Sequence, residues 1–241
     1  IRQALRRHPV AQLEEIDRQV NQMLEHGLIE PAASPWASNV VLVRRKDGQL
    51  RFCVDYRAAN SCTYKDAYPL PNIGVCLDAL NGASWFTTLD LRAGYHNIPI
   101  AERSRDVTAF ITRKGIWRYK VVPFGLTTAP AVMQRCMDLV LTGLTLETCL
   151  VYLDDVIIFG RCFEELWQRL DQVLKRFADA RLKLKPSKCA FFQRRVSFLG
   201  HIVSEQGLEM QPDKLEAVRN WPTPRDLTSL KSYLGLCSYY R

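Results

Sequence analysis

Two adjacent acids inside an apolar stretch constrain this chain more than any other feature. Residues 150–159 read Leu-Val-Tyr-Leu-Asp154-Asp155-Val-Ile-Ile-Phe. Apolar, β-branched runs are typical of strands in a buried sheet, where an isolated ionised carboxylate is very costly. Two like charges about 4 Å apart repel by roughly 4 kcal/mol at an effective dielectric near 20. The sequence therefore predicts a hairpin whose two acids share a divalent cation, and all-oxygen ligands suit Mg²⁺ or Mn²⁺ best.

A third acid strengthens this interpretation. Asp90 ends the apolar segment 85–91, and it would face Asp154 if the two strands pair in one sheet. Three carboxylates around two cations suit in-line nucleotidyl transfer, because one metal ion activates the attacking oxygen and the other steadies the leaving pyrophosphate. The plainer alternative is a surface turn with two solvated aspartates and, separately, an ordinary acid at the end of a strand.

The order of the expected elements indicates the fold class. Strands alternate with helices and one hairpin, which favours an α+β architecture with an antiparallel sheet and helices on one face. The Pro at position 130 suits the first turn of a helix. We expect helices over residues 13–28, 130–141, 163–177 and roughly 212–241, and strands over 39–43, 51–54, 85–91 and 198–203.

The charge of the chain is concentrated. The net charge is +8, and residues 175–195 hold eight basic residues against a single acid, Asp179. Such a patch predicts a polyanionic partner, most often nucleic acid, although a solvated basic helix face is the alternative. The eight cysteines show no CxxC spacing, which argues against a zinc site and a disulfide framework and favours a reducing compartment. There is no run of about 18 apolar residues, so we expect no membrane partner.

Short motifs in a fixed order connect the chain with a known family. They are 34–38 (SPWAS), 45–48 (RKDG), 51–57 (RFCVDYR), 89–96 (LDLRAGYH), 122–130 (VPFGLTTAP), 152–155 (YLDD) and 198–201 (FLGH). In these motifs the chain resembles the reverse transcriptase of gypsy-class long-terminal-repeat retrotransposons and, more distantly, that of retroviruses. Asn97, Thr128 and the pair Val132-Met133 depart from the usual pattern.

The resemblance implies a right-hand polymerase with an antiparallel palm sheet packed on helices. It implies an RNA-directed DNA polymerase fragment of a Pol polyprotein that uses two ions of Mg²⁺ or Mn²⁺. Its partners would be an RNA or DNA template with primer, dNTP and other segments of the same polyprotein, inside the cell or a virus-like particle. The implied parts are fingers over 1–65 and 98–128, palm over 66–97 and 129–207, and the start of a thumb, truncated, over 208–241.

The resemblance also assigns roles to residues. Asp90 and Asp154 would be the main metal ligands, helped by the Leu91 carbonyl, and Asp155 would be a secondary acid. The expected nucleotide-binding residues include Arg51 and either Arg45 or Lys46 as triphosphate clamps, and Tyr95 as a ring that excludes a 2′-hydroxyl. Phe124, Gly125, where the backbone would approach the nucleotide, and Lys188, a general acid for pyrophosphate, complete that set. The expected primer-binding residues are Phe198, Leu199, Gly200 and His201, which resemble the hairpin that holds the primer end in this family.

Two other functions remain open at this stage. A co-opted or defective element could bind nucleic acid through its basic face without catalysis. A metal-dependent nuclease could use the same carboxylates, although hydrolysis has no use for Tyr95 or for a triphosphate-clamping hairpin. The start at Ile1 and the end at Arg241, inside a helical pattern, suggest a piece of a longer protein with weakened grip on primer and template.

Overall fold

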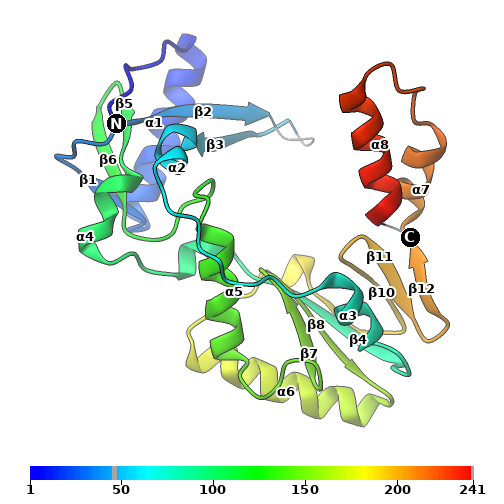
Figure 1. The fold of residues 1–241 in the computed structure, drawn as a ribbon. Coiled ribbons are helices and arrows are strands. Elements are labelled where there is room, and N and C mark those ends of the chain that lie inside the picture. The colour runs from blue at the N-terminus through cyan, green and yellow to red at the C-terminus, as the bar shows by residue number, and fades with distance from the viewer. Residues whose placement is uncertain (45–47, 240–241) are drawn as a thin grey trace. The chain divides into compact units, whose positions relative to one another are not determined.

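The computed structural model describes residues 1–44 and 48–239. The chain forms two compact units, one of residues 1–70 with 92–137 and the other of residues 71–91 with 138–241 (Figure 1). This division follows packing alone, so the finger, palm and thumb boundaries stay predictions. Within the described ranges, no helix combines the length and the apolar character needed to cross a bilayer.

A mixed five-stranded sheet organises the first unit. Its strand order is β1-β6-β5-β2-β3. Strands β2 and β5 pair in parallel, and all other neighbouring strands of this sheet pair antiparallel. The strands are β1 (Ile29–Pro31), β2 (Ser38–Arg44), β3 (Leu50–Val54), β5 (Phe110–Thr112) and β6 (Gly115–Tyr119). The helices are α1 (Val10–Glu25), α2 (Arg57–Ser61), α4 (Glu102–Arg105), the 3-10 turns η1 (Gly94–Asn97) and η2 (Asp106–Thr108), and most of α5 (Ala129–Val140).

The core of the first unit lies between α1 and this sheet. Ile16 and Val20 of α1 are buried in one cluster with Val40, Phe110 and Tyr119. Apolar residues spaced three or four apart give α1 one buried stripe, and the chain leaves the helix through Gly27 at φ 67. The predicted helix and the predicted β2–β3 pairing are confirmed.

An antiparallel four-stranded sheet, β7-β8-β4-β9, organises the second unit. The strands are β4 (Trp85–Asp90), β7 (Cys149–Tyr152), β8 (Asp155–Gly160) and β9 (Ala190–Gln193). Helix α6 (Phe163–Asp179) packs on β8 and β4 through its buried stripe. The helix α3 (Ile73–Asp78) contributes Leu77 to a cluster with Phe86 and Ile157. These observations confirm the predicted α+β architecture with an antiparallel sheet.

A separate three-stranded antiparallel sheet lies in the same unit, formed by β10 (Arg195–Phe198), β11 (His201–Ser204) and β12 (Gly207–Met210). The single strand predicted over residues 198–203 is wrong. Phe198 pairs with His201, and Leu199 and Gly200 form the turn between them with φ 46 and 76. Two positive φ angles define a type I′ hairpin turn. The 3-10 turn η3 (Pro186–Lys188) and the helices α7 (Pro212–Arg219) and α8 (Leu227–Tyr239) complete the unit.

Candidate active site

Strands β4 and β8 bring two of the three predicted acids face to face. Their antiparallel register places Asp90 directly opposite Asp155, rather than opposite Asp154 as the sequence suggested. Directly opposed residues project from the same face of a sheet, with Cα atoms about 4.5–5.5 Å apart. The predicted pairing of the two strands is confirmed, and its register makes Asp155 the direct neighbour of Asp90.

A tight turn carries Asp154. Tyr152 pairs with Asp155, so the hairpin between β7 and β8 has a two-residue loop of Leu153 and Asp154. Leu153 has φ 58, a left-handed conformation that glycine usually supplies at the first position of a type II′ turn. For a side chain such as leucine this conformation costs roughly 1–2 kcal/mol. Such local strain is typical of functional turns, and here it fixes Asp154 beside Asp155 at the tip of the hairpin.

The neighbouring acids raise the proton affinity of Asp155, and a lysine opposes this effect. The pKa of Asp155 is raised by partial burial and by the neighbouring carboxylates of Asp154 and Asp90, while Lys188 lowers it. Lys188 Nζ lies 3.0 Å from Asp90 Oδ2. The segment around η3 is tied to the end of β4, because Lys185 N donates to Asp90 O over 2.9 Å. An ammonium group therefore compensates part of the charge of this cluster.

The chemistry of these groups fits a divalent cation. The carboxylate oxygens are hard ligands, and their negative charges lie close together. The Lys188 ammonium group already compensates part of this charge. Across residues 1–44 and 48–239, no three His, Cys, Asp or Glu side chains converge as ligands of one ion. The structure thus brings Asp90 and Asp155 together and leaves the complete ligand set a prediction. Leu91, whose carbonyl was the fourth predicted ligand, is buried and forms a bridge with Leu184.

A cavity of about 270 Å³ connects Asp90 and Asp155 with the β10–β11 turn. Asp90, Asp155 and Lys188 line it together with residues 197–200. Three of the four predicted primer-binding residues, Phe198, Leu199 and Gly200, therefore share a cavity with the acids. The fourth, His201, does not line that cavity, and its ring lies 5.8 Å from the ring of Tyr239.

The first unit gathers most of the predicted nucleotide-binding residues around Phe124. The guanidinium carbon of Arg51 lies 4.9 Å from the centre of the Phe124 ring. The ring of Tyr95 meets the Phe124 ring edge to face, with centroids 5.1 Å apart. Phe124 itself is 39% exposed, so part of its ring is accessible to a ligand. Arg45 and Lys46 lie outside the described residues.

The sequence did not indicate Asn60, which holds the loop after Phe124. Its side-chain amide donates to Gly125 O over 2.8 Å, and its Oδ1 accepts from Thr127 N at 2.9 Å. Gly125 has φ 98, and a Cβ there would lie 3.4 Å from Tyr56 Cδ2. The loop thus needs glycine for its backbone conformation and Asn60 for its position.

Comparison with known proteins agrees with this geometry. Residues 43–203 match the family described as "Reverse transcriptase (RNA-dependent DNA polymerase)". The retrovirus-related Pol polyprotein from transposon 297 of Drosophila melanogaster is 40% identical over 98% of this chain, which covers 23% of that protein. The Pol polyprotein from transposon gypsy of the same organism is 38% identical over 94% of the chain and 22% of its own length.

Solved structures share the fold. A foamy viral protease-reverse transcriptase in complex with double-stranded DNA has a TM-score of 0.89 at 24% identity, covering 99% of this chain and 42% of that one. The same viral protein with an RNA/DNA hybrid has a TM-score of 0.86 at 23% identity, covering 99% and 32%. This likeness confirms the predicted polymerase fold, and the chain spans about a quarter of the curated relatives it matches. The chain belongs to the reverse transcriptase (RNA-dependent DNA polymerase) family, alongside the Pol polyproteins of gypsy-type transposons.

Proposed function

We propose that this chain is the RNA-directed DNA polymerase segment of a Pol polyprotein, and that it adds deoxynucleotides to a primer 3′-hydroxyl. One observation supports this most: Asp90 lies opposite Asp155 in paired strands, beside a strained turn that carries Asp154. The family shares this activity by its description. The alternative of a non-catalytic remnant is less favoured, because the chain has all three acids and Asp90 lies opposite Asp155, next to the turn that carries Asp154.

In this proposal the acids hold two divalent ions, Mg²⁺ or Mn²⁺. Asp90 and Asp154 are the main ligands, with the Leu91 carbonyl, and Asp155 is the secondary acid. The ions, when bound, would activate the primer hydroxyl and stabilise charge on the leaving pyrophosphate. Lys188 lies within reach of this chemistry through its contact with Asp90. It would then donate a proton or a charge-assisted hydrogen bond to the pyrophosphate.

The incoming nucleotide is assigned to the residues around Phe124. Arg51, with Arg45 or Lys46, would bind the triphosphate, because guanidinium forks match phosphate oxygens. Gly125 would let the backbone approach the nucleotide, and Tyr95 would pack under the sugar. The cluster of Arg51, Tyr95 and Phe124 supports this assignment.

The nucleic acid would contact the basic stretch and the β10–β11 turn. Four of the eight basic residues in 175–195 form ion pairs, with Asp171, Asp90, Glu205 and Glu209. Within the described part of the chain, no ion pair involves the other four, which are Arg176, Arg181, Lys183 and Lys185. These four are the proposed phosphate contacts, and Phe198, Leu199, Gly200 and His201 are the proposed primer contacts. Solved relatives bind double-stranded DNA and RNA/DNA hybrid.

Primer extension tests the proposed function. Residues 1–241 are incubated with poly(rA)/oligo(dT), dTTP and Mg²⁺ or Mn²⁺, and extended primer is measured. We expect extension that depends on the divalent ion. Binding of the primer–template without any extension under either ion would favour the non-catalytic alternative, and cleavage of the nucleic acid would favour the nuclease.

Tyr95→Val is expected to increase ribonucleotide incorporation at least about tenfold relative to deoxynucleotide incorporation. The reason is that a smaller side chain leaves room for a 2′-hydroxyl, and one lost steric exclusion is worth about 1–3 kcal/mol. The ratio of kcat/KM for rTTP and dTTP measures this effect. Tyr64→Val is the matched control, because Tyr64 is 98% exposed. An unchanged ratio in the Tyr95 variant would remove Tyr95 from the nucleotide site.

Asn60→Ala is expected to raise the KM for dNTP about five- to tenfold with a smaller effect on kcat. The variant loses both hydrogen bonds that fix residues 125–127, each worth about 0.5–1.5 kcal/mol. Asn60→Asp keeps the acceptor for Thr127 N and should recover part of the loss. Steady-state kinetics with varied dNTP make the measurement. If KM stays at the parent value while only thermal stability falls, Asn60 has a purely structural role.

A further inference from the structure

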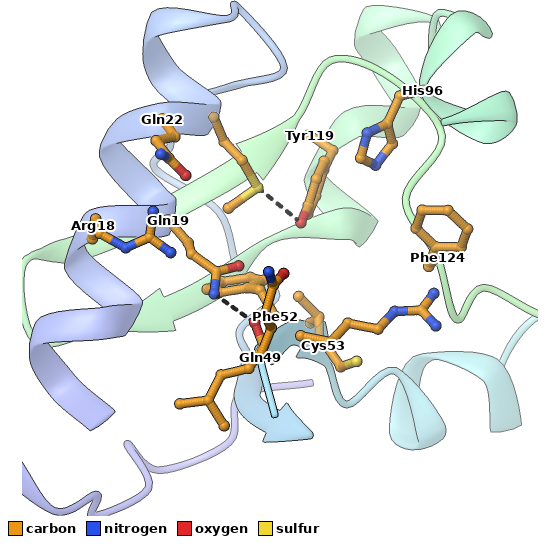
Figure 2. Close-up of a pocket in the computed structure, with 13 residues that line it drawn as sticks. Arg18, Gln19, Gln22, Gln49, Phe52, Cys53, His96, Tyr119 and Phe124 are labelled. Atoms are coloured by element: carbon orange, nitrogen blue, oxygen red, sulfur yellow. Dashed lines mark hydrogen bonds between the residues drawn. The ribbon is translucent and has the colours of Figure 1, made fainter. Parts of the chain in front are cut away.

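A side chain of α1 is hydrogen-bonded to the start of β3. The two elements line an open pocket of about 320 Å³ within the first unit (Figure 2). Beside this pocket the Gln19 side-chain amide donates to Leu50 O over 3.0 Å. Leu50 is the first residue of β3, and the next residue is Arg51. One hydrogen bond thus connects α1 with the strand that carries a proposed triphosphate-binding residue.

The Gln19 amide is also fixed at its helix end. Its nitrogen donates to Glu15 Oε1 over 2.5 Å, one turn earlier in α1. Because a primary amide carries two hydrogens, the contacts with Glu15 and Leu50 can form together. Glu15 accepts from Arg18 Nε over 2.8 Å, and the hydrogen bond from Arg18 is the main cause that lowers the pKa of the Glu15 carboxyl. Glu15 is therefore an ionised, strong acceptor at pH 7, and it orients the Gln19 amide.

The two partners of this hydrogen bond differ in how firmly they are held. Ile16 and Val20 lie on either side of Gln19 in the sequence, and both are buried in the core of the first unit. Strand β3 lies at the edge of its sheet and, in the described part of the chain, pairs with β2 alone. A side-chain hydrogen bond from a packed helix therefore restricts the free end of an edge strand.

The direction of the Arg51 side chain depends on this strand end. Its guanidinium carbon lies 4.9 Å from the centre of the Phe124 ring. Among the residues that the structure describes, no ion pair involves Arg51, so the ring and the backbone of β3 orient it. A guanidinium fork binds phosphate oxygens in a defined geometry, and a shift of about 1 Å in its base is enough to disturb that geometry.

We propose that Gln19 is a positioning residue for nucleotide binding, because it holds Leu50 O and thereby keeps Arg51 directed toward the triphosphate. The inference rests on the proposed role of Arg51, and Gln19 acts through Arg51 and not on the nucleotide. When the hydrogen bond is lost, Arg51 adopts the productive orientation in a smaller fraction of the molecules. The triphosphate is bound in the ground state and in the transition state alike, so the loss raises the KM for dNTP and leaves kcat nearly unchanged.

Steady-state primer extension with varied dTTP tests the proposal. Gln19→Glu keeps the size of the side chain but cannot donate to Leu50 O. We expect its KM for dTTP to rise about three- to tenfold, the usual worth of one hydrogen bond, with kcat within about twofold of the parent value. Gln22→Glu is the matched control, because Gln22 lines the same pocket from the same helix and, within the described ranges, its side chain forms no hydrogen bond.

Two further variants distinguish positioning from a purely structural role. Gln19→Lys restores a donor for Leu50 O and should return KM to within about twofold of the parent value. Gln22→Lys is the control for its added charge. In an Arg51→Ala background, Gln19→Glu should change KM less than about twofold, because its effect requires the guanidinium group. A purely structural role would give the same factor in both backgrounds.

Equilibrium binding of dTTP separates this inference from the proposed function. The affinity is measured with poly(rA), a dideoxy-terminated oligo(dT) primer and Mg²⁺, where no bond can form, and the same three- to tenfold loss is expected for Gln19→Glu. The proposal is overturned if the parent protein does not bind dTTP, if Gln19→Glu binds it like the parent, or if the loss persists without Arg51. Extension by the parent with unchanged affinity in Gln19→Glu would remove this inference alone. Gln19-dependent binding without any extension would remove the proposed function alone.

Discussion

Asp154→Asn is expected to reduce single-turnover nucleotide incorporation about a thousandfold, while the affinity for primer–template changes less than about twofold. In the proposed two-ion site the substitution would remove a charged ligand, and a loss of about 4 kcal/mol in transition-state stabilisation corresponds to that factor. Asn and Asp have nearly the same shape, so the hairpin should keep its fold. Rapid-quench incorporation and filter binding of the duplex provide the two measurements.

Two further variants make this test specific. Asp213→Asn is the control, because Asp213 is exposed on α7 and, among the described residues, forms no ion pair. Asp155→Asn distinguishes the role of Asp155 from that of Asp154, because the strand register places Asp155, and not Asp154, opposite Asp90. We expect the larger loss at Asp154. An Asp154→Asn protein with the parent rate would contradict the metal-site assignment, and a larger loss at Asp155 would exchange the roles of the two residues.

Gly160→Ala should lower the free energy of unfolding by about 3 kcal/mol. Gly160 ends β8, and a Cβ at this position would lie 2.8 Å from Leu166 N and 3.1 Å from Leu166 Cα in α6. Both atoms belong to the backbone of a helix, so the clash can be relieved only by moving α6 away from the sheet. Overpacking of this kind typically costs 1–3 kcal/mol or more. Urea denaturation followed by circular dichroism measures the change.

Gly235→Ala is the matched control for Gly160→Ala. Gly235 lies inside α8, and a Cβ there meets no atom within 4 Å. Because alanine is the better helix former by about 1 kcal/mol, this variant should be as stable as the parent or slightly more so. A Gly160→Ala protein with unchanged stability would show that α6 does not pack tightly against the end of β8.

Much of the fold followed from residue patterns. The apolar stripe of α6 at Leu166, Leu170, Val173 and Phe177 predicted that helix, and the acids between two apolar runs predicted the β7–β8 hairpin. The register of β4 against β8 could not be predicted from the residue pattern. Strand side chains repeat every two residues, so the pattern alone does not select which residue of one strand faces Asp90.

The missed features depend on residues that are distant in sequence or on unusual backbone angles. Asn60 reaches Gly125, and Lys188 reaches Asp90, without any local pattern that pairs them. The family resemblance implied the β10–β11 hairpin at residues 198–201. The residue pattern missed it, because Leu199 adopts φ 46 and leucine is not a turn residue. Only Gly200 signalled the turn, and the apolar residues on either side favoured a continuous strand.

The contact between Lys188 and Asp90 gives the acids on β4 and β8 an internal counter-ion. Since this cation is part of the polypeptide, we expect the edge of the sheet to fold in solutions poor in free divalent ions. In the proposed reaction, divalent ions held by the acids would neutralise the carboxylate, and the same ammonium group would then be free to contact the departing diphosphate. Lys188 would in this way first stabilise the folded edge of the sheet and then take part in the catalytic cycle.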